Sequence, residues 1–363
     1  MAQALTRDPD RGRTVIANPW RSAAGLVRRR RGHRDAGFPD TQELALYQPL
    51  RLRRGDPSTH AGLTRSYLRL DARLARYAVR RGLREPVLVT CHPVHAAVAH
   101  RSRWSDVVYY AWDDWLSFPP FSAQRSTYAW AYREIAARDT NVVGVTTAIA
   151  DRIQARRSTV VPNGIHAADF ESLPPVPSWY AALPRPLGLY AGSIEERVDL
   201  QLVAMCARAL PGWSFVLVGH QENAGLTDAL RALPNVVLGG HQPRSRVLAM
   251  MAGADVGLIP HRDTPMTRAM SPLKLYEYLA AGVPVVASDL APVRGVSDRC
   301  LLAGNREEFV AAVPAAAALG ACDPAELRDF RLRHDWASRY RVWKTAVLPV
   351  AARRLVTDDG DQR

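Results

Sequence analysis

The stretch SPLKLYEYLAAGVPVVASDLAPVRG, from Ser271 to Gly295, has the pattern of a helix that leads into a buried strand. Pro272 opens the helix, since its fixed φ suits the first turn, and Gly282 stands where a helix commonly ends. The apolar run at 284–289 then predicts a strand. This helix-to-strand step is the building block of parallel sheets, so it predicts an α/β fold.

Similar steps surround this stretch along most of the chain. Apolar runs alternate with helix-like patterns, one of which spans 63–84 with apolar residues on one face and arginines on the other. Strands are predicted at 14–19, 44–50, 86–91, 107–111, 142–146, 158–161, 187–193, 214–220, 235–240, 255–261 and 284–289. Such sheets bind ligands at the edge where the strands end, so we expect functional residues in the loops that follow these strands.

A proline-rich segment divides the predicted strands into two series. The segment PPVPSWYAALPRP, residues 174–186, holds five prolines, which resist both helix formation and strand pairing. A chain of 363 residues is also long for a single hydrophobic core. We therefore predict an N-terminal domain over 1–173, a linker over 174–186 and a C-terminal domain over 187–334.

The net charge of +13 suits an anionic partner such as nucleic acid, a membrane surface or a phosphorylated ligand. No zinc, helix-turn-helix or aromatic-interleaved RNA motif accompanies the charge, so we expect no nucleic-acid partner. Almost all of the basic residues are arginines, and the two lysines are Lys274 and Lys344. The scarcity of lysine draws attention to Lys274, which lies in the stretch quoted above.

Several other classes of protein are disfavoured. The four cysteines lie far apart in the sequence, so we expect neither a disulfide framework nor a metal site. The first residues, MAQALTRDPDRGR, lack the apolar core of a signal peptide, and we expect a cytoplasmic protein. The first strand is followed by NPWRSAAG rather than by a G-x-G-x-x-G turn, which argues against a dinucleotide-dependent oxidoreductase.

Lys274 and Glu277 lie three residues apart and so share one surface of the predicted helix. Near the helix start, Lys274 can add a positive charge beside backbone amides that face a diphosphate, and Glu277 can accept hydrogen bonds from two ribose hydroxyls. The pair therefore suits a nucleoside diphosphate. The alternative is a surface ion pair of little energetic value.

With its flanks, this stretch resembles the donor-binding motif of GT-B glycosyltransferases of family 4, or group 1, and is most similar to the teichuronic-acid type. The resemblance covers residues 86–348 and is sharpest over 160–295. It implies a GT-B fold, with two Rossmann-like, doubly wound parallel-sheet domains facing a cleft. It also implies that residues 335–363 form a helix that crosses back to the N-terminal domain, followed by a frayed tail.

The resemblance assigns roles to individual residues of the C-terminal half. It implies Glu277 as the ribose partner and Lys274, with Leu275, as donor-binding residues. A second glutamate of the family motif is replaced by Ala269, which leaves backbone amides, Thr267 or Arg268 to contact the transferred sugar.

Three strand-end loops complete the expected donor site. Gly192 and Arg197 would face the phosphates, where glycine permits a close backbone approach and arginine offers a planar fork. The loops Gly219-His220 and Gly240-His241 are where such folds receive the diphosphate and the base. The alternative for Arg197 is a solvated residue paired with a neighbouring carboxylate.

In such enzymes the first domain holds the acceptor. The segment YYAWDDWLSF, 109–118, resembles the family's acidic motif, so Asp113 and Asp114 are candidates to orient the acceptor hydroxyl or take its proton. The alternative is strand capping or surface pairing with Arg125. His92, which follows a predicted strand, is the second catalytic candidate.

Together these features predict a hexosyltransferase-type glycosyltransferase of cell envelope polysaccharide synthesis. The expected donor is a UDP- or GDP-linked sugar, and the acceptor a glycan, a lipid-linked compound or a small molecule. We expect no metal or other cofactor, and retention of anomeric configuration. The basic segments Arg28–Arg31 and 63–84 suggest peripheral contact with an anionic membrane. The alternatives are a nucleotide-sugar epimerase of the same fold and an inactive GT-B homologue acting as a partner protein, which Ala269 would favour.

Overall fold

A computed structural model describes residues 2–9, 12–17, 20–22, 44–51, 55–221 and 223–348 of the chain. The chain divides into two compact units. Unit 1 consists of residues 1–161 and 340–363, and unit 2 of residues 162–339. The predicted basic segment Arg28–Arg31 and the predicted frayed tail lie outside the described residues.

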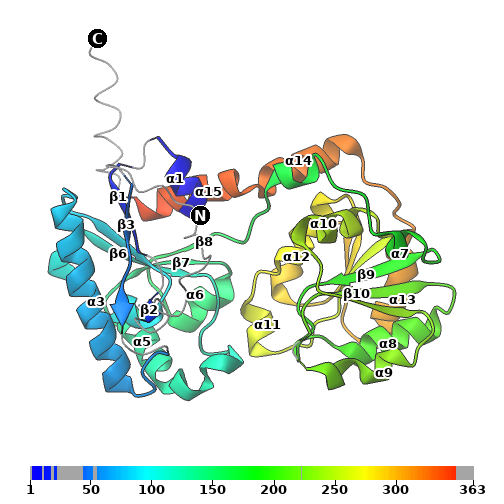
Figure 1. Cartoon of the computed structure of the whole chain (residues 1–363), viewed down its shortest axis with the longest axis horizontal. Coiled ribbons are helices and arrows are strands. Elements are labelled where there is room, and N and C mark those ends of the chain that lie inside the picture. The colour runs from blue at the N-terminus through cyan, green and yellow to red at the C-terminus, as the bar shows by residue number, and fades with distance from the viewer. Residues whose placement is uncertain are drawn as a thin grey trace, which may run out of the picture. The chain divides into compact units, whose positions relative to one another are not determined.

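Unit 1 is built on a four-stranded parallel sheet in the order β5-β6-β7-β8 (Figure 1). These strands are Val87–Thr90, Asp106–Ala111, Asn141–Gly144 and Ser158–Val160. Two parallel pairs precede them: β1 (Thr14–Ala17) with β3 (Leu44–Tyr47), and β2 (Arg21–Ser22) with β4 (Leu50–Arg51). The helices are α1 (Ala2–Arg7), α3 (His60–Arg80), α4 (Pro93–Val98), α5 (Arg125–Ala137) and α6 (Thr147–Ile153), with short 3-10 turns at Arg101–Arg103 and Pro119–Gln124.

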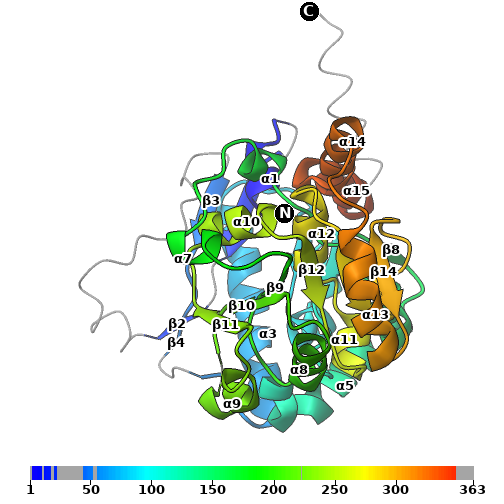
Figure 2. The same ribbon diagram turned by 90° about the vertical axis from the view of Figure 1, so that its right-hand side faces the viewer.

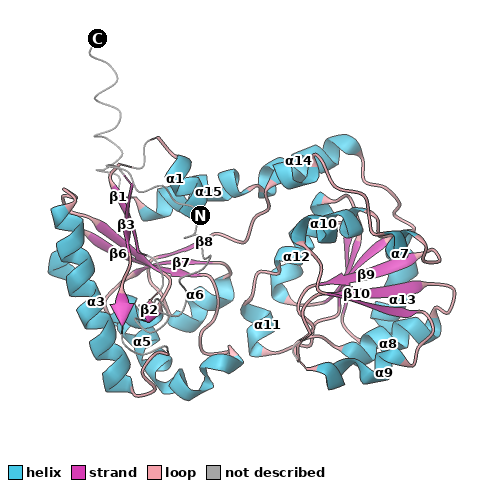
Figure 3. Ribbon diagram, in the orientation of Figure 1, coloured by secondary structure: helices cyan, strands magenta, loops and turns pink. Residues whose placement is uncertain are grey.

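The strands of unit 2, magenta in Figure 3, form one parallel sheet. It has six strands in the order β11-β10-β9-β12-β13-β14. The strands are β9 (Leu187–Ala191), β10 (Ser214–Val218), β11 (Val236–Gly240), β12 (Val256–Ile259), β13 (Val285–Ser288) and β14 (Cys300–Ala303). Numbered within the unit, this order is 3-2-1-4-5-6, which is the order of the doubly wound nucleotide-binding fold. The strand order reverses between β9 and β12, so the sheet has its topological switch point there.

Helices cover both faces of the unit 2 sheet (Figure 2). One apolar core gathers residues of α8 and α13 against the sheet, and the other gathers residues of α10, α12 and α14. The helices of the unit are α7 (Ser178–Ala181), α8 (Leu200–Ala209), α9 (Asp228–Arg231), α10 (Arg244–Ala252), α11 (Pro265–Ala269), α12 (Leu273–Ala280), α13 (Arg306–Ala317) and α14 (Pro324–His334). Three-residue or four-residue 3-10 turns lie at Ala167–Phe170, Ala224–Thr227 and Ala291–Val293. The strands are apolar on both sides because both faces are covered.

The predicted α/β fold with parallel sheets is confirmed. A strand overlaps every predicted run, and the run at 44–50 contains two short strands, β3 and β4. The edge strand β14 was not predicted, because the sequence CLLA is short; its two middle residues, Leu301 and Leu302, are not buried. The decisive helix forms as α12, with Pro272 at its N-cap and Gly282, at φ 82°, just beyond its end.

The proline-rich segment differs from the predicted linker. The division between the units falls between Val161 and Pro162, and residues 174–186 belong to unit 2. Within the segment, Tyr180 is 1% exposed and donates a hydrogen bond from Oη to Met250 O at 2.8 Å, while Trp179 packs against the same core. The prolines shape the path of the chain, but these apolar side chains hold the segment on its own unit.

The last described helix, α15 (Trp336–Val347), begins in unit 2 and belongs to unit 1 from Tyr340 onward. Tyr340 donates from Oη to Asp8 Oδ2 at 2.6 Å, and Lys344 Nζ lies 2.7 Å from the same oxygen. Trp343 packs with Val108 in a buried cluster of unit 1. The end of the described chain is therefore part of the first unit's core.

Among the helices of the described residues, none has both the length and the apolar character that a membrane span requires.

Candidate functional site

Two strand-end loops meet at the switch point of the unit 2 sheet. One follows β9 and contains Gly192 and Arg197, and the other follows β12 and contains His261. The loops are joined by backbone hydrogen bonds from Arg262 N to Arg197 O at 2.8 Å and from Asp199 N to Pro260 O at 2.7 Å. Ligands of doubly wound sheets bind outside the strand ends at this point, so the loops stand where a nucleotide is expected.

Lys274, in the first turn of α12, reaches this edge. Its Nζ lies 3.9 Å from the centroid of the Tyr190 ring, is inaccessible to water and has no hydrogen-bond partner among the described residues. Burial, and then the nearby Arg197 guanidinium, holds the pKa of Lys274 well below its usual value. A side chain on Gly192 would place its Cβ 2.7 Å from this Nζ. Glycine at position 192 therefore makes room for the buried, unpaired amine itself.

Two further nitrogens beside Lys274 also lack partners. Arg197 Nε and His261 Nε2 are both buried without a hydrogen-bond partner in the described part of the chain. The terminal nitrogen Nη2 of Arg197 forms an ion pair with Glu195 Oε1 at 3.4 Å. Burial, followed by the charges of Lys274 and Arg197, lowers the pKa of His261 well below its ordinary value.

This arrangement can bind an anion. Buried polar groups in folded proteins are nearly always hydrogen-bonded, and three unpaired nitrogens within one site are therefore exceptional. Phosphate oxygens accept from several donors at once and restore the charged forms of lysine and histidine that burial disfavours. The chemistry of the cluster fits a diphosphate.

The backbones of the strand-end loops approach each other as closely as glycine permits. Gly192 and Gly219 have φ values of 143° and 149°, which side-chain-bearing residues rarely adopt. A Cβ on Gly219 would lie 1.9 Å from Gly192 O, and Gly219 N donates to Gly240 O at 2.9 Å. The side chains of His220 and His241, which follow two of these glycines, are exposed.

Glu277 is 7% exposed and accepts a hydrogen bond from Arg244 Nη1 at 2.5 Å. Arg244 also donates to Asp169 Oδ2 at 3.2 Å, so the guanidinium bridges two carboxylates. Among the described residues Glu277 therefore pairs with Arg244, and the surface ion pair with Lys274 that the sequence allowed does not form. Its carboxylate stays a candidate ribose partner that a neighbouring arginine holds in place.

The structure does not gather every predicted donor residue at the switch point. Leu275 is fully buried and its side chain packs in the core of unit 2, so only its backbone is available to a ligand. The predicted sugar-contacting loop folds as the short helix α11. Thr267 Oγ1 is engaged there with Arg262 O at 2.6 Å, and Arg268 pairs with Asp263 at 2.5 and 2.7 Å.

His261 was not predicted as a site residue. It ends the predicted strand at 255–261 in the same way that His220 and His241 follow theirs. The sequence signal was therefore a histidine directly after a parallel strand. What could not be seen from sequence is that its strand, β12, is the neighbour of β9.

In unit 1, Asp113 and Asp114 have different surroundings. Asp114 is fully buried, whereas Asp113 is half-buried and accepts from Asp114 N at 2.8 Å. The carboxylate of Asp114 accepts hydrogen bonds from Leu116 N, Ser117 Oγ, Tyr132 Oη and Arg152 Nη1. These contacts support a structural role for Asp114, with Arg152 as its partner, and leave Asp113 as the more accessible candidate for the acceptor.

His92 stands at the N-cap of α4 inside an aromatic cluster. Its ring stacks on Tyr67 at a centroid distance of 4.0 Å and meets Trp115 edge-on at 4.6 Å. Neither ring nitrogen has a hydrogen-bond partner within the described residues. Burial lowers the pKa of His92 to about 3, so the imidazole is neutral at physiological pH and is a weak base. It suits hydrogen bonding to a substrate better than proton removal.

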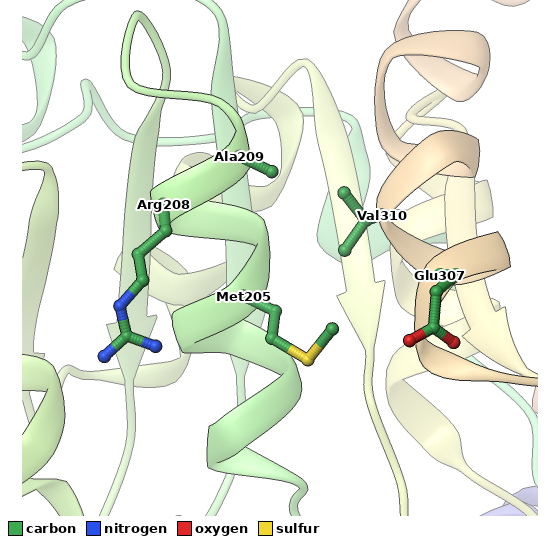
Figure 4. A pocket seen from close by; sticks show the side chains of 5 residues that line it. All are labelled: Met205, Arg208, Ala209, Glu307 and Val310. Atoms are coloured by element: carbon green, nitrogen blue, oxygen red, sulfur yellow. The ribbon is translucent and has the colours of Figure 1, made fainter.

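A separate hollow of about 510 Å³ lies between α8 and α13 (Figure 4). It is lined by Met205, Arg208, Ala209, Glu307 and Val310. The residues predicted for the donor site do not line it. Across the described residues, no group of three or more His, Cys, Asp or Glu side chains is placed to hold a metal ion.

Residues 185–318 match the family model "Glycosyl transferases group 1". Over 104 residues the chain is 36% identical to a Bacillus subtilis (strain 168) protein named "Putative teichuronic acid biosynthesis glycosyltransferase TuaH". That match spans 28% of this chain and 26% of the relative, so the chain is matched to about a quarter of the length of the relative.

Solved structures resemble most of the chain. An OtsA structure has a TM-score of 0.65 at 16% identity, covering 96% of this chain and 95% of its own. An alpha,alpha-trehalose-phosphate synthase (UDP-forming) from Burkholderia vietnamiensis has a TM-score of 0.58 at 15% identity, with 88% and 91% covered. S. aureus TarM, solved with Fondaparinux, alpha-GlcNAc-glycerol and UDP, has a TM-score of 0.54 at 11% identity, with 76% and 58% covered.

At these identities the solved structures show a shared fold, and the family model covers the part of the chain that holds Gly192, Arg197, His261 and Lys274. Residues 185–318 therefore form a glycosyl transferases group 1 domain, and the chain has the GT-B fold.

Proposed function

We propose that this chain is a glycosyltransferase that transfers a sugar from a nucleotide-diphosphate sugar held by unit 2. The observation that carries the proposal is the cluster of Arg197 Nε, His261 Nε2 and Lys274 Nζ, three buried nitrogens without partners among the described residues at the switch point of the sheet. The group 1 match over the same residues supports it.

In the proposed reaction the bond between the sugar's anomeric carbon and the β-phosphate oxygen breaks, and an acceptor hydroxyl oxygen forms the new bond to that carbon. The hydroxyl proton passes to a base, for which the Asp113 carboxylate is the candidate. The diphosphate leaves with additional negative charge. Lys274 and Arg197 stabilise this charge as it develops, which lowers the barrier. Because the cations of the chain itself supply this stabilisation, we propose a reaction that needs no divalent metal.

Glu277 is the proposed ribose partner, with its orientation fixed by Arg244. The donor base is proposed to be uridine or guanosine. Retention of the anomeric configuration is proposed from the family resemblance, and NMR of the product anomer tests it. The proposed acceptor is a glycan, a lipid-linked compound or a small molecule bound by unit 1, where Asp113 and His92 are the candidate contacts. We further propose that the protein acts in the cytoplasm, at an anionic membrane surface.

Thermal-shift measurements with UDP, GDP, ADP and TDP test the donor site. A ligand present at about 100 times its Kd stabilises the folded state by about 2.7 kcal/mol. We expect one or two of these nucleotides to raise the Tm of the wild type and to have little effect on Lys274→Ala. Equal stabilisation of both proteins, or of neither, would remove the assignment of the diphosphate to this cluster.

A further inference from the structure

Helix α3 of unit 1 has two sharply different faces. Its 21 residues begin after Thr59, whose Oγ1 accepts from Gly62 N at 3.2 Å and caps the helix. One face is buried in unit 1, and its residues recur at helical spacing. The buried side chains are Leu63, Tyr67, Leu70, Asp71, Leu74, Ala75 and Ala78. The residues of the opposite face are not buried in unit 1.

The exposed face carries a row of five arginines. These are Arg65, Arg69, Arg73, Arg76 and Arg80. With 3.6 residues per turn, they fall within an arc of about 80° centred opposite the buried face. At 1.5 Å per residue, the row is about 22 Å long. We call this row, Arg65 to Arg80, the α3 arginine row.

Among the described residues, no carboxylate neutralises the charges of the α3 arginine row. None of the ion pairs formed between described residues involves any of the five guanidinium groups. The helix contains a single acidic residue, Asp71, which is buried and accepts hydrogen bonds from Arg103 Nη1 at 2.6 Å and Trp104 Nε1 at 2.7 Å. The row therefore presents five positive charges that form no ion pair with the rest of the described chain.

Two large apolar side chains stand beside the row. Leu68 is 44% exposed and Val79 is 67% exposed. On the same helical wheel they lie next to each other, about 40° to 60° from Arg65 on the side away from Arg73. Arginine stems with apolar neighbours match the boundary of a lipid bilayer, where the charges meet phosphates and the apolar groups meet acyl chains.

We propose that the α3 arginine row is a docking surface for anionic phospholipid bilayers. It supplies the surface for the proposed membrane contact, and it is independent of how the donor is bound. Each arginine near an anionic bilayer strengthens binding by a factor of about five, so several charges acting together give useful affinity. Nucleic acid offers the same phosphates, but it gives Leu68 and Val79 nothing apolar to enter.

The test is co-sedimentation of the full chain with vesicles of phosphatidylcholine alone or mixed with phosphatidylglycerol. We expect binding only to the mixed vesicles, and a decrease as salt rises. The triple variant Arg69→Gln, Arg73→Gln, Arg76→Gln should lower the partition coefficient about a hundredfold. Leu68→Ser with Val79→Ser should lower it about tenfold.

The matched control is Arg208→Gln, Arg246→Gln, Arg328→Gln, three exposed arginines of unit 2. Either triple variant lowers the net charge of +13 by three, to +10. Equal loss in both variants, or equal binding to neutral and anionic vesicles, would overturn the proposal. The proposal would also be overturned if the wild type bound single-stranded RNA but no vesicles, and the α3 variant did not bind the RNA.

Nucleotide thermal shifts on the same proteins separate this inference from the donor site. We expect the α3 triple variant to keep the wild-type nucleotide response and circular dichroism spectrum, which shows that it is folded. Loss of vesicle binding with an unchanged nucleotide response supports the docking surface by itself. A wild type that responds to nucleotide but does not bind anionic vesicles rules out the docking surface and leaves the donor site standing.

Discussion

Asp114 in unit 1 and Lys274 in unit 2 both hold a charged group away from water, and they differ in what surrounds it. The Asp114 carboxylate receives hydrogen bonds from three side chains and one backbone amide. Lys274 Nζ has an aromatic face 3.9 Å away and no hydrogen-bond partner in the described part of the chain.

The difference separates a group that maintains the fold from a group that awaits a ligand. A buried charge with all of its partners contributes to one native arrangement, and the loss of any partner costs stability. A buried charge without partners lowers stability in the free protein, and a ligand that pairs with it recovers the lost interaction. From the sequence alone, both Asp114 and Lys274 are candidate site residues.

The largest expected effect is on turnover. Lys274→Ala should lower kcat/KM about 10²–10³-fold, because one donor to the developing charge is lost. Release of nucleoside diphosphate from the donor measures it. Lys344→Ala is the matched control, since Lys344 is the other lysine and pairs with Asp8 at 2.7 Å in unit 1. That variant should lose some stability and keep its turnover. Similar turnover in both variants would contradict the role of Lys274 as a group that awaits a ligand.

The second effect is on stability. Asp114→Asn should lower the free energy of unfolding by about 1–3 kcal/mol, because Arg152 and Ser117 lose a charged acceptor. Urea unfolding of this variant and of Asp113→Asn measures the difference, and Asp113→Asn should be close to the wild type. A stable but inactive Asp114→Asn protein would return Asp114 to the list of catalytic candidates.

The third effect is on pH dependence. Because the pKa of Lys274 in the free protein lies below its unfolded value, the unfolded chain binds more protons between the two values, and stability rises with pH there. A bound diphosphate raises this pKa, so binding takes up a proton. Nucleotide affinity should then fall as pH rises, by at most about tenfold per pH unit for each proton. Titration calorimetry in buffers of different ionisation enthalpy measures the uptake, which Lys274→Met should reduce.

The smallest effect concerns the support of Glu277. Arg244 is about half exposed, so its pairing with Glu277 is partly screened by water. Arg244→Gln should weaken nucleotide binding about two- to fivefold, through a less fixed Glu277. Glu277→Gln should weaken it more. A larger loss in Arg244→Gln than in Glu277→Gln would mean that Arg244 itself contacts the ligand.

Local sequence patterns were sufficient to predict much of the fold. Apolar runs and their turns located the strands of both units, and Pro272 and Gly282 marked the bounds of α12. The structure of segment 174–186 was harder to predict. Its proline content indicates a stiff backbone but does not show that the Tyr180 side chain is buried in a core. Burial is decided by distant parts of the chain, and a single sequence does not show them.

The candidate site, too, could be predicted only as far as local sequence patterns reach. Lys274, Gly192 and Arg197 were predicted from motifs, and the structure brings them to one edge of the sheet. A motif does not show the surroundings of these residues. Because β9 pairs with β12, His261 lies beside them, and Arg197 Nε, His261 Nε2 and Lys274 Nζ are buried. Leu275 differs from them: the motif predicts a donor-binding residue, but its side chain packs in the core of unit 2.

Asp8 and its partners Tyr340 and Lys344 tie together residues from opposite ends of the described chain. Unit 1 is therefore discontinuous in sequence, whereas unit 2 is one uninterrupted segment. On the ribosome, unit 2 has all of its own residues before unit 1 has received α15. Until then Val108 and Val143 lack the cover of Trp343. The first half of the protein to be synthesised is thus the last to be completed, and a nascent chain that stalls before Tyr340 would expose an unfinished core to chaperones and proteases.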